Sequence, residues 1–287
     1  MKAWCLSRAV VLIAMMGSRF IAAFESAVLV TGSTDGIGVT TAKNMALQGF
    51  HVLVHGRDEG RIRKAEQAIK SFVQKRSGSE NKARILPLPA ADLSTVQGTR
   101  QLANDVIRTC QEEDLDLKVL MNNAGVFSED HVITNDGTEL TFAVNVVAPF
   151  VLTSRLLPTM LLDKDGNKKK QRRIVIASSI SQCGSIRDWD DLVYERRRYS
   201  AHGAYSESKL LDAMLTFEFA ERFKTKGIHE DIMICNCLDP GTVNTKMLLV
   251  RAYVDPFGAK ARVKIVPVLI TQSRFNLSSG RLGSLWH

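Results

Sequence analysis

The sequence lacks the features that mark several classes of protein. Its five cysteines have neither the spacing of a metal site nor that of a disulfide framework, so we interpret them as buried thiols of a reduced compartment. No internal repeat and no long linker rich in proline, glycine or serine divides the 287 residues. The apolar run at 9–17 is too short to cross a bilayer, and Arg19 interrupts its continuation. A metal module, a cross-linked secreted scaffold and a repeat protein are therefore not expected.

Acidic residues are scarce at the C-terminal end. The formal net charge is +8, and residues 251–287 contribute +5 of it, with six basic side chains against one acid. The rest of the chain is only mildly basic, so a nucleic-acid partner is not expected. The charge run at 163–173 has no interleaved aromatic residue, and we interpret it as a solvated loop. A nuclear-targeting or nucleic-acid-binding patch is the alternative there.

Residues 1–25 fit two interpretations. Lys2 and Arg8 precede the short apolar run and the small residues Ala22 and Ala23 follow it, as in a targeting or membrane-associating leader. An N-terminal extension without a targeting role fits equally well. The compartment therefore stays open between the cytoplasm and a membrane-associated location at the endoplasmic reticulum or another organelle.

Short apolar runs alternate with longer amphipathic stretches through residues 26–247. We predict strands at 27–31, 51–55, 84–88, 117–121, 173–177 and 231–237. We predict helices at 36–49, 58–76, 94–113, 137–162 and 201–226. Strands that are apolar on both faces and alternate with helices predict an α/β fold with a doubly wound parallel sheet, the Rossmann fold, in a single domain. The segment 248–287 is atypical, since it is basic and has no convincing amphipathic helix.

A glycine-rich turn joins the first predicted strand to the first predicted helix. Residues 31–38 read TGSTDGIG, in which Gly32 permits a sharp turn and Gly36 lets the backbone approach a pyrophosphate. Gly38 allows the helix to pack closely against the strand. The helix N-terminus offers free N–H groups and a partial positive charge to an anion. The turn therefore predicts a dinucleotide-binding site.

Tyr205 and Lys209 lie four positions apart on a predicted helix. Four residues are about one helical turn, so the phenol and the ammonium project from the same face. A free tyrosine, with a pKa of about 10, is a poor base at neutral pH. A neighbouring ammonium stabilises the phenolate, so the pair is suited to proton transfer at a substrate oxygen.

These motifs, in this order, resemble the short-chain dehydrogenases/reductases over most of the chain. The matching elements are TGxxxGxG at 31–38, NNAG at 122–125 and YxxxK at 205–209. The resemblance implies a nicotinamide cofactor and hydride transfer between an alcohol and a carbonyl. The catalytic set that it implies is Asn145, Ser179, Tyr205 and Lys209, with Ser178 and Ser181 competing for the role of Ser179.

In that set, Ser179 would hydrogen-bond the substrate oxygen and Asn145 would hold a water against the lysine. Pro149 predicts a kink in the helix of Asn145 that exposes backbone carbonyls to such a water. The two asparagines of NNAG would either brace the sheet or contact the cofactor directly, and the sequence supports both roles equally. A PGxVxT motif at 240–245 would dock the nicotinamide.

The resemblance also predicts which residues bind the cofactor, and it predicts no metal ligand. The cofactor-binding residues are Gly32, Ser33, Asp35, Gly36, Ile37, Gly38, Arg57, Asp92, Leu93, Asn123, Ala124, Gly125, Tyr205, Lys209, Pro240, Gly241, Val243 and Thr245. Arg57 follows the second strand, where an arginine pairs with the 2′-phosphate of NADP(H) and a carboxylate would repel it. NADP(H) is therefore favoured over NAD(H). The carboxylate of Asp58, next to Arg57, is the feature that argues against this preference.

Two departures from the family pattern bear on the substrate. Ser179 and Tyr205 are 26 positions apart, about twice the interval of the simplest members, and the extra residues include the segment 189–192, WDDL. This insertion resembles the retinol-dehydrogenase-like branch, whose members act on apolar alcohols or aldehydes and in many cases attach to membranes. In 248–287 the substrate-covering elements look missing or replaced, and a divergent or abnormally spliced C-terminus is our hypothesis.

We therefore predict an NADP(H)-dependent oxidoreductase acting on a small, apolar alcohol, aldehyde or ketone, with Tyr205 as general acid/base. Peripheral membrane association and a homo-oligomer are expected by analogy with the family alone. The alternative is a catalytically silent nucleotide-binding sensor or scaffold. The unusual C-terminal segment favours this alternative, whereas the presence of both Tyr205 and Lys209 argues against it.

Overall fold

The computed structural model describes residues 25–162 and 171–241. Its centre is a parallel sheet with the strand order β3-β2-β1-β4-β5-β6. The strands are β1 (Ser26–Val30), β2 (His51–Val54), β3 (Ile85–Pro87), β4 (Asp116–Asn122), β5 (Arg172–Ala177) and β6 (Met233–Leu238). The order reverses between β1 and β4, which is the doubly wound arrangement that the sequence predicts. All six predicted strands are confirmed, with ends that differ by one or two residues.

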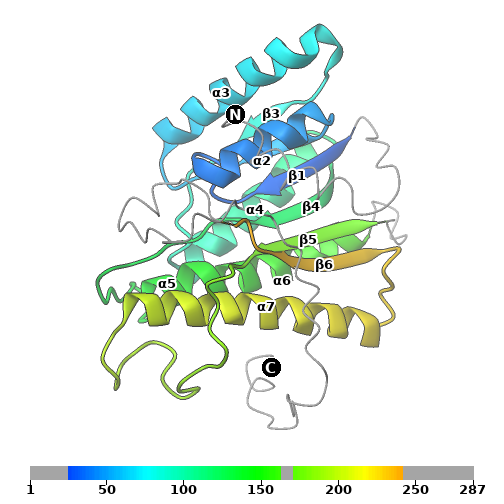
Figure 1. Cartoon of the computed structure of the whole chain (residues 1–287). Coiled ribbons are helices and arrows are strands. Elements are labelled where there is room, and N and C mark those ends of the chain that lie inside the picture. The colour runs from blue at the N-terminus through cyan, green and yellow to red at the C-terminus, as the bar shows by residue number, and fades with distance from the viewer. Residues whose placement is uncertain (1–24, 163–170, 242–287) are drawn as a thin grey trace.

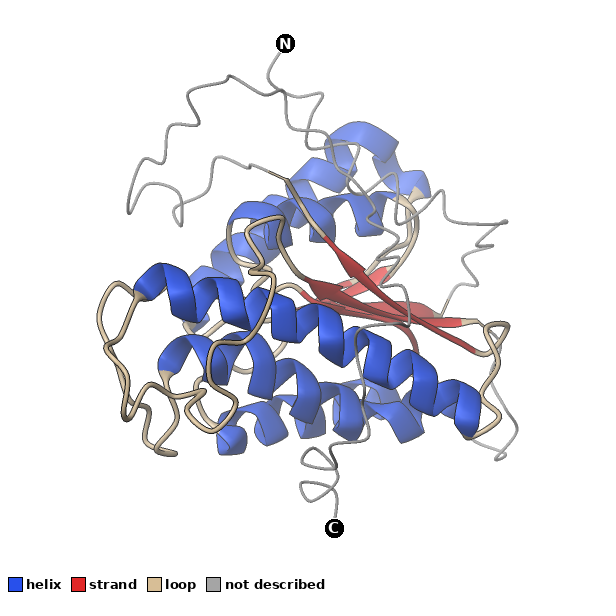
Figure 2. Cartoon of the chain, turned by 60° about the horizontal axis from the view of Figure 1, so that its bottom comes forward, coloured by secondary structure: helices blue, strands red, loops and turns tan. Residues whose placement is uncertain are grey.

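Helices cover both faces of this sheet (Figure 1). Successive residues of a strand point to opposite faces, and β1 uses both: Ala27 and Leu29 pack in one apolar cluster, Val28 and Val30 in the other. The helices are α2 (Gly36–Leu47) and α3 (Glu59–Ser77) on one face, and α4 (Val96–Glu112), α6 (Ala148–Leu161) and α7 (Ala201–Thr225) on the other. Figure 2 shows helices of the second face lying side by side along the sheet.

The predicted helix at 137–162 is divided in the structure. A short helix, α5 (Leu140–Phe142), leads into a π-helical turn, η2 (Ala143–Val147), and then into α6. Pro149 has no N–H to donate to the carbonyl of residue 145, so the regular ladder cannot continue through this turn. The disturbance predicted around Pro149 thus takes the form of a π turn that contains Asn145.

Among the described residues, the stretch Leu140–Leu161 is long and apolar enough to cross a membrane by length and composition. Its buried side chains include Leu152, Leu156 and Met160, which belong to the apolar cluster that α4, α6 and α7 form on the sheet. A core helix of a globular domain passes the same test, and this burial identifies the stretch as one.

Other predictions lie outside the described residues. These are the leader or extension at the N-terminus, most of the charge run at 163–173, the segment 248–287, and the site residues Val243 and Thr245. The loop 178–200, which carries the insertion, is described, and it lies beside the N-terminal end of α7 (Figure 1).

Candidate active site

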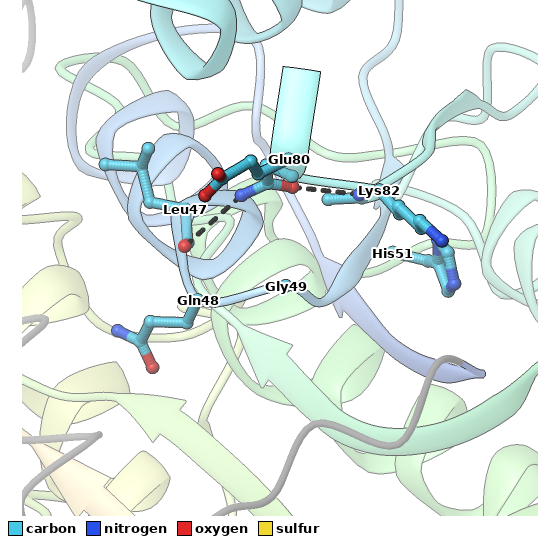
Figure 3. A pocket seen from close by; sticks show the side chains of 8 residues that line it. Leu47, Gln48, Gly49, His51, Glu80 and Lys82 are labelled. Atoms are coloured by element: carbon cyan, nitrogen blue, oxygen red, sulfur yellow. Dashed lines mark hydrogen bonds between the residues drawn. The ribbon is translucent and has the colours of Figure 1, made fainter. Parts of the chain in front are cut away.

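The predicted site residues meet at one edge of the sheet because all six strands run parallel. The glycine-rich turn follows β1, Arg57 follows β2, the NNAG motif closes β4, and Ser179 follows β5. Carboxyl ends of parallel strands lie at the same edge, and ligands bind there at the point where the strand order reverses. A pocket lined by His51, Glu80 and Lys82 opens at the opposite edge, where β2 begins, and is separate from this site (Figure 3).

The glycine-rich turn has the shape that its glycines permit. Gly32 and Gly36 have φ angles of 64° and 53°, a region that favours glycine. A Cβ on Gly38 would lie 2.2 Å from the carbonyl oxygen of Gly32, so no larger residue fits there. Asp35 caps α2 by accepting a hydrogen bond from the Gly36 N–H at 2.8 Å, and Arg61 pairs with the same carboxylate at 3.3 Å.

The NNAG motif holds this turn against β4. The hydroxyl oxygen of Thr31 accepts hydrogen bonds from the backbone N–H groups of Asn123 and Ala124, each at 2.9 Å. The side chain of Asn123 donates to the carbonyl of Thr31, also at 2.9 Å. A Cβ on Gly32 would come within 3.1 Å of the Cα of Ala124. The structure therefore shows Asn123 bracing the turn, and Ala124 as the small residue that allows the close approach.

His55 also supports the turn, and sequence reasoning missed it. Its Nδ1 accepts from the backbone N–H of Gly32 at 3.1 Å, so its Nε2 carries the proton and donates to the carbonyl of Ala91 at 3.1 Å. Burial lowers the pKa of His55 to about 4, which keeps the ring neutral. The hydroxyl of Ser33 is buried and accepts from the backbone N–H of His55 at 2.9 Å. A histidine at the end of the predicted strand 51–55 was the only sign of this role.

Arg57, Asp92 and Leu93 border the region that follows β2 and β3. Arg57 is exposed and makes no hydrogen bond or ion pair with the residues that the structure describes. The carboxylate of Asp58 caps α3 by accepting from the Arg61 N–H at 2.8 Å, so this acid is occupied. Asp92 is exposed and accepts from the Ser94 N–H at 2.9 Å, whereas Leu93 is buried in the core.

Lys209 projects from α7 to the end of β5, and Tyr205 lies beside it. The Nζ of Lys209 lies 5.6 Å from the centre of the Tyr205 ring. It donates to the carbonyl of Ala177, the last residue of β5, and to Oδ2 of Asp212, each at 2.8 Å. Tyr205 is half-buried, and the ring of Phe127 lies 5.6 Å from it, centre to centre. The phenol is thus placed next to a buried ammonium, as the sequence spacing predicts.

The two serines after β5 have different environments. Ser178 is buried, and its hydroxyl donates to the carbonyl of Lys209 at 2.7 Å. Ser179 is half-buried, and its Oγ accepts from the Ser181 N–H at 3.1 Å, which leaves its own O–H free to donate. Ser181 is exposed. This geometry supports Ser179 as the serine that could meet a substrate oxygen.

Asn145 joins the end of β4 to α7. Its Oδ1 accepts from the backbone N–H of Val126 at 2.8 Å, and its Nδ2 donates to the Val126 carbonyl at 3.1 Å and to Ser208 Oγ at 2.9 Å. A Cβ on Gly125 would lie 3.4 Å from Asn145 Oδ1 and 3.7 Å from Lys209 Nζ. Asn145, Gly125 and Lys209 therefore converge, with the π turn supplying backbone beside them.

Glu207, inside the YxxxK motif, anchors the insertion, and sequence reasoning missed this role. Arg197 donates to both of its carboxylate oxygens, at 2.8 and 2.6 Å, and the Tyr194 hydroxyl donates to Oε2 at 3.1 Å. The Arg197 guanidinium also lies 3.8 Å from the centre of the Tyr194 ring. The insertion is therefore bound to α7 between Tyr205 and Lys209. The only sign in the sequence was an acid in the motif and arginines in the insertion.

The last described part of the site follows β6. Pro240 and Gly241 lie after the strand, and the carboxylate of Asp239 accepts from the Gly241 N–H at 3.0 Å. Within residues 25–162 and 171–241, no three histidine, cysteine, aspartate or glutamate side chains are grouped as metal ligands. The glycine-rich turn, at the N-terminal end of α2, has the form of a dinucleotide-binding turn.

Comparison with known proteins agrees with this geometry. Residues 26–252 match the family described as short chain dehydrogenase. The chain is 34% identical to human polyprenol dehydrogenase over 217 residues, which cover 76% of this chain and 60% of that protein. It is 33% identical to human retinol dehydrogenase 13 over 220 residues, covering 77% of this chain and 60% of that one.

The likeness extends to solved structures. A crystal structure of an uncharacterized protein from Mycobacterium paratuberculosis has a TM-score of 0.59 and 27% sequence identity, covering 78% of this chain and 71% of that one. The matched part spans about 60% of the length of the curated relatives named above. The strand order, the glycine-rich turn, the Tyr205–Lys209 pair and these matches lead to one conclusion. The chain belongs to the short-chain dehydrogenase family.

Proposed function

We propose that the protein is an NADP(H)-dependent oxidoreductase that interconverts an alcohol and a carbonyl on a small, apolar substrate. The observation that carries the proposal is the convergence of Tyr205, Lys209 and Asn145 beside the turn of a dinucleotide site, with Ser179 at the adjoining strand end. A nicotinamide cofactor bound there would supply or accept the hydride. The chain's own residues would then transfer the proton and hydrogen-bond the substrate oxygen.

Tyr205 is the general acid/base of this proposal. In carbonyl reduction its phenol donates a proton to the substrate oxygen, and in alcohol oxidation its phenolate removes one. Lys209 favours the phenolate, because an ammonium near the ring stabilises negative charge there. The O–H of Ser179 hydrogen-bonds the same substrate oxygen and fixes its position. By resemblance to the family, Asn145 would hold a water against Lys209, and this water would carry the proton toward solvent.

Arg57 supports the preference for NADP(H). It is exposed after the end of β2, and the carboxylate of the neighbouring Asp58 caps α3 by accepting a hydrogen bond from the Arg61 N–H. The guanidinium is therefore free to pair with a 2′-phosphate. Arg57→Asp is expected to weaken NADPH binding roughly 10- to 100-fold, the worth of a charge-assisted hydrogen bond. Arg63→Asp, the same change at an exposed position on α3, is the control, and an equal effect of both would contradict the assignment.

An apolar substrate is supported by the loop that leaves β5. Ile180, next to Ser179, is 72% exposed, and Trp189 in the insertion is 48% exposed. Ile180 adjoins Ser179, so its exposed side chain offers contact to an apolar ligand there. The names of the polyprenol and retinol dehydrogenases point the same way, so long-chain isoprenoid and retinoid alcohols and aldehydes are the first substrates to test.

The test follows the nicotinamide absorbance, with NADPH for a panel of such aldehydes and NADP+ for the corresponding alcohols. We expect turnover that Tyr205→Phe abolishes. Tyr199→Phe is the matched control, since the Tyr199 hydroxyl donates to the carbonyl of Ser128 and lies outside the catalytic set. NADPH binding without turnover, unchanged by Tyr205→Phe, would instead favour a nucleotide-binding sensor or scaffold.

A further inference from the structure

A carboxylate stands on the side of Lys209 away from the tyrosine motif. Asp212 lies one helical turn further along α7, and its Oδ2 accepts from Lys209 Nζ at 2.8 Å. The two side chains are 1% and 5% exposed, so the ion pair is shielded from solvent. The other oxygen, Oδ1, is buried and accepts no hydrogen bond from the residues that the structure describes. Within the described part of the chain, Lys209 is thus the only hydrogen-bond donor to this carboxylate.

The ammonium has three N–H groups, and the protein holds two of them. One goes to the carbonyl of Ala177 and one to Asp212, which leaves a single N–H for the site. A carboxylate at hydrogen-bond distance also offsets the positive charge that Lys209 presents to the phenol. Because both charges are buried, water does little to weaken this effect.

We propose that Asp212 is a positioning residue that fixes the Lys209 ammonium and offsets part of the positive charge that this ammonium presents to the Tyr205 phenol. This inference rests on the proposed function, in which Tyr205 moves the proton.

The surroundings of Asp212 are consistent with this role. Burial raises the pKa of Asp212 to about 6, with the Lys209 ammonium opposing the rise, so the carboxylate is ionised at neutral pH. Within the described part of the chain, the ionisable groups that act on it are Lys209 on α7 and the Cys237 thiol on β6. Burial, and then the Asp212 carboxylate among its other causes, raises the pKa of Cys237, which keeps that thiol neutral.

The direct test is the ionisation of Tyr205, followed by NMR of the full chain with ¹³Cζ-labelled tyrosine. The chain has four tyrosines, and Tyr205→Phe identifies the signal of interest. We expect Asp212→Asn to lower the titration midpoint of Tyr205 by about one pH unit, and Asp212→Glu to restore it toward the wild-type value. Asp188→Asn removes the same charge from an exposed pair with Arg196 and should leave the midpoint unchanged.

Equal behaviour of Tyr205 in the wild type and in Asp212→Asn, including no ionisation in either, would overturn the proposal. Should Asp212→Asn fail to fold, Asp212→Ser leaves room for a water beside Lys209 and tests the same shift. Failure of both variants to fold would assign Asp212 a purely structural role. The titration needs no substrate, so absence of turnover in the wild type would refute the proposed function and leave this result standing by itself.

Discussion

Breaking the ion pair between Arg197 and Glu207 is expected to release the insertion from α7. The change is Arg197→Met, which removes the guanidinium and keeps most of the apolar stem. The Glu207 side chain is 6% exposed and that of Arg197 is 19% exposed, so the pair is largely shielded from water. After the change, the partners that the buried carboxylate keeps among the described residues are the Tyr194 hydroxyl and the Arg187 N–H.

The expected cost follows from leaving a buried charge without its counterion. Such a loss costs about 3 kcal/mol, the lower end of the usual range, because Arg197 retains some exposure. For a domain of this size, that corresponds to a fall in melting temperature of about 6–12 °C. Because Glu207 lies between Tyr205 and Lys209, kcat/KM should fall as well. NADPH affinity should change little, since the glycine-rich turn is held by other contacts.

Thermal unfolding, steady-state kinetics and NADPH titration of the same preparations check this prediction. Arg196→Met is the control, because Arg196 and Asp188 form an exposed pair whose loss should cost under about 1 kcal/mol. The double variant Arg197→Met/Glu207→Gln should lose less stability than the two single variants lose when their losses are added. Equal melting temperatures for Arg197→Met and Arg196→Met would refute the reasoning.

Three further predictions concern the turn and the serines. Gly38→Ala should abolish tight NADPH binding in fluorescence titrations, because the new Cβ would lie 2.2 Å from the Gly32 carbonyl oxygen; unchanged affinity would contradict the packing. His55, with a pKa of about 4 in the folded chain against 6.5 unfolded, contributes stability that is fully present above pH 6.5 and is lost as pH falls toward 4. Denaturant unfolding should show a loss of about 3 kcal/mol over that range, and His55→Gln should remove this pH dependence. Ser179→Ala should lower kcat at an unchanged melting temperature, whereas Ser178→Ala should mainly lower the melting temperature. The reverse pattern would show that Ser178 is the catalytic serine and Ser179 the structural one.

The sequence by itself predicts the fold and the position of each motif. Strands apolar on both faces, such as the one at 27–31, and amphipathic helices are periodic local patterns that can be recognised without knowing the rest of the chain. Parallel strands then place the residues that follow each one at the same edge. The proximity of Tyr205 to Lys209 follows in the same way from the helical repeat.

Only the tertiary structure shows the contacts that join segments far apart in the chain. The Gly32 N–H meets His55 from 23 positions away, and the carbonyl of Ala91 meets the same ring from 36 positions away. Nothing in the local sequence around these residues specifies such a contact. It arises when adjacent strands bring their ends together.

Local spacing also leaves the charge balance of the site open. From the spacing alone, the acid that shares a helical face with Lys209 could be exposed to solvent or buried in the core. The attraction between the two charges is much stronger in the buried case. Burial of Asp212 and Glu207 is decided by the packing of α7 against the sheet and of the insertion against α7. Charges interact strongly where water is excluded, and the exclusion of water is a property of the whole fold.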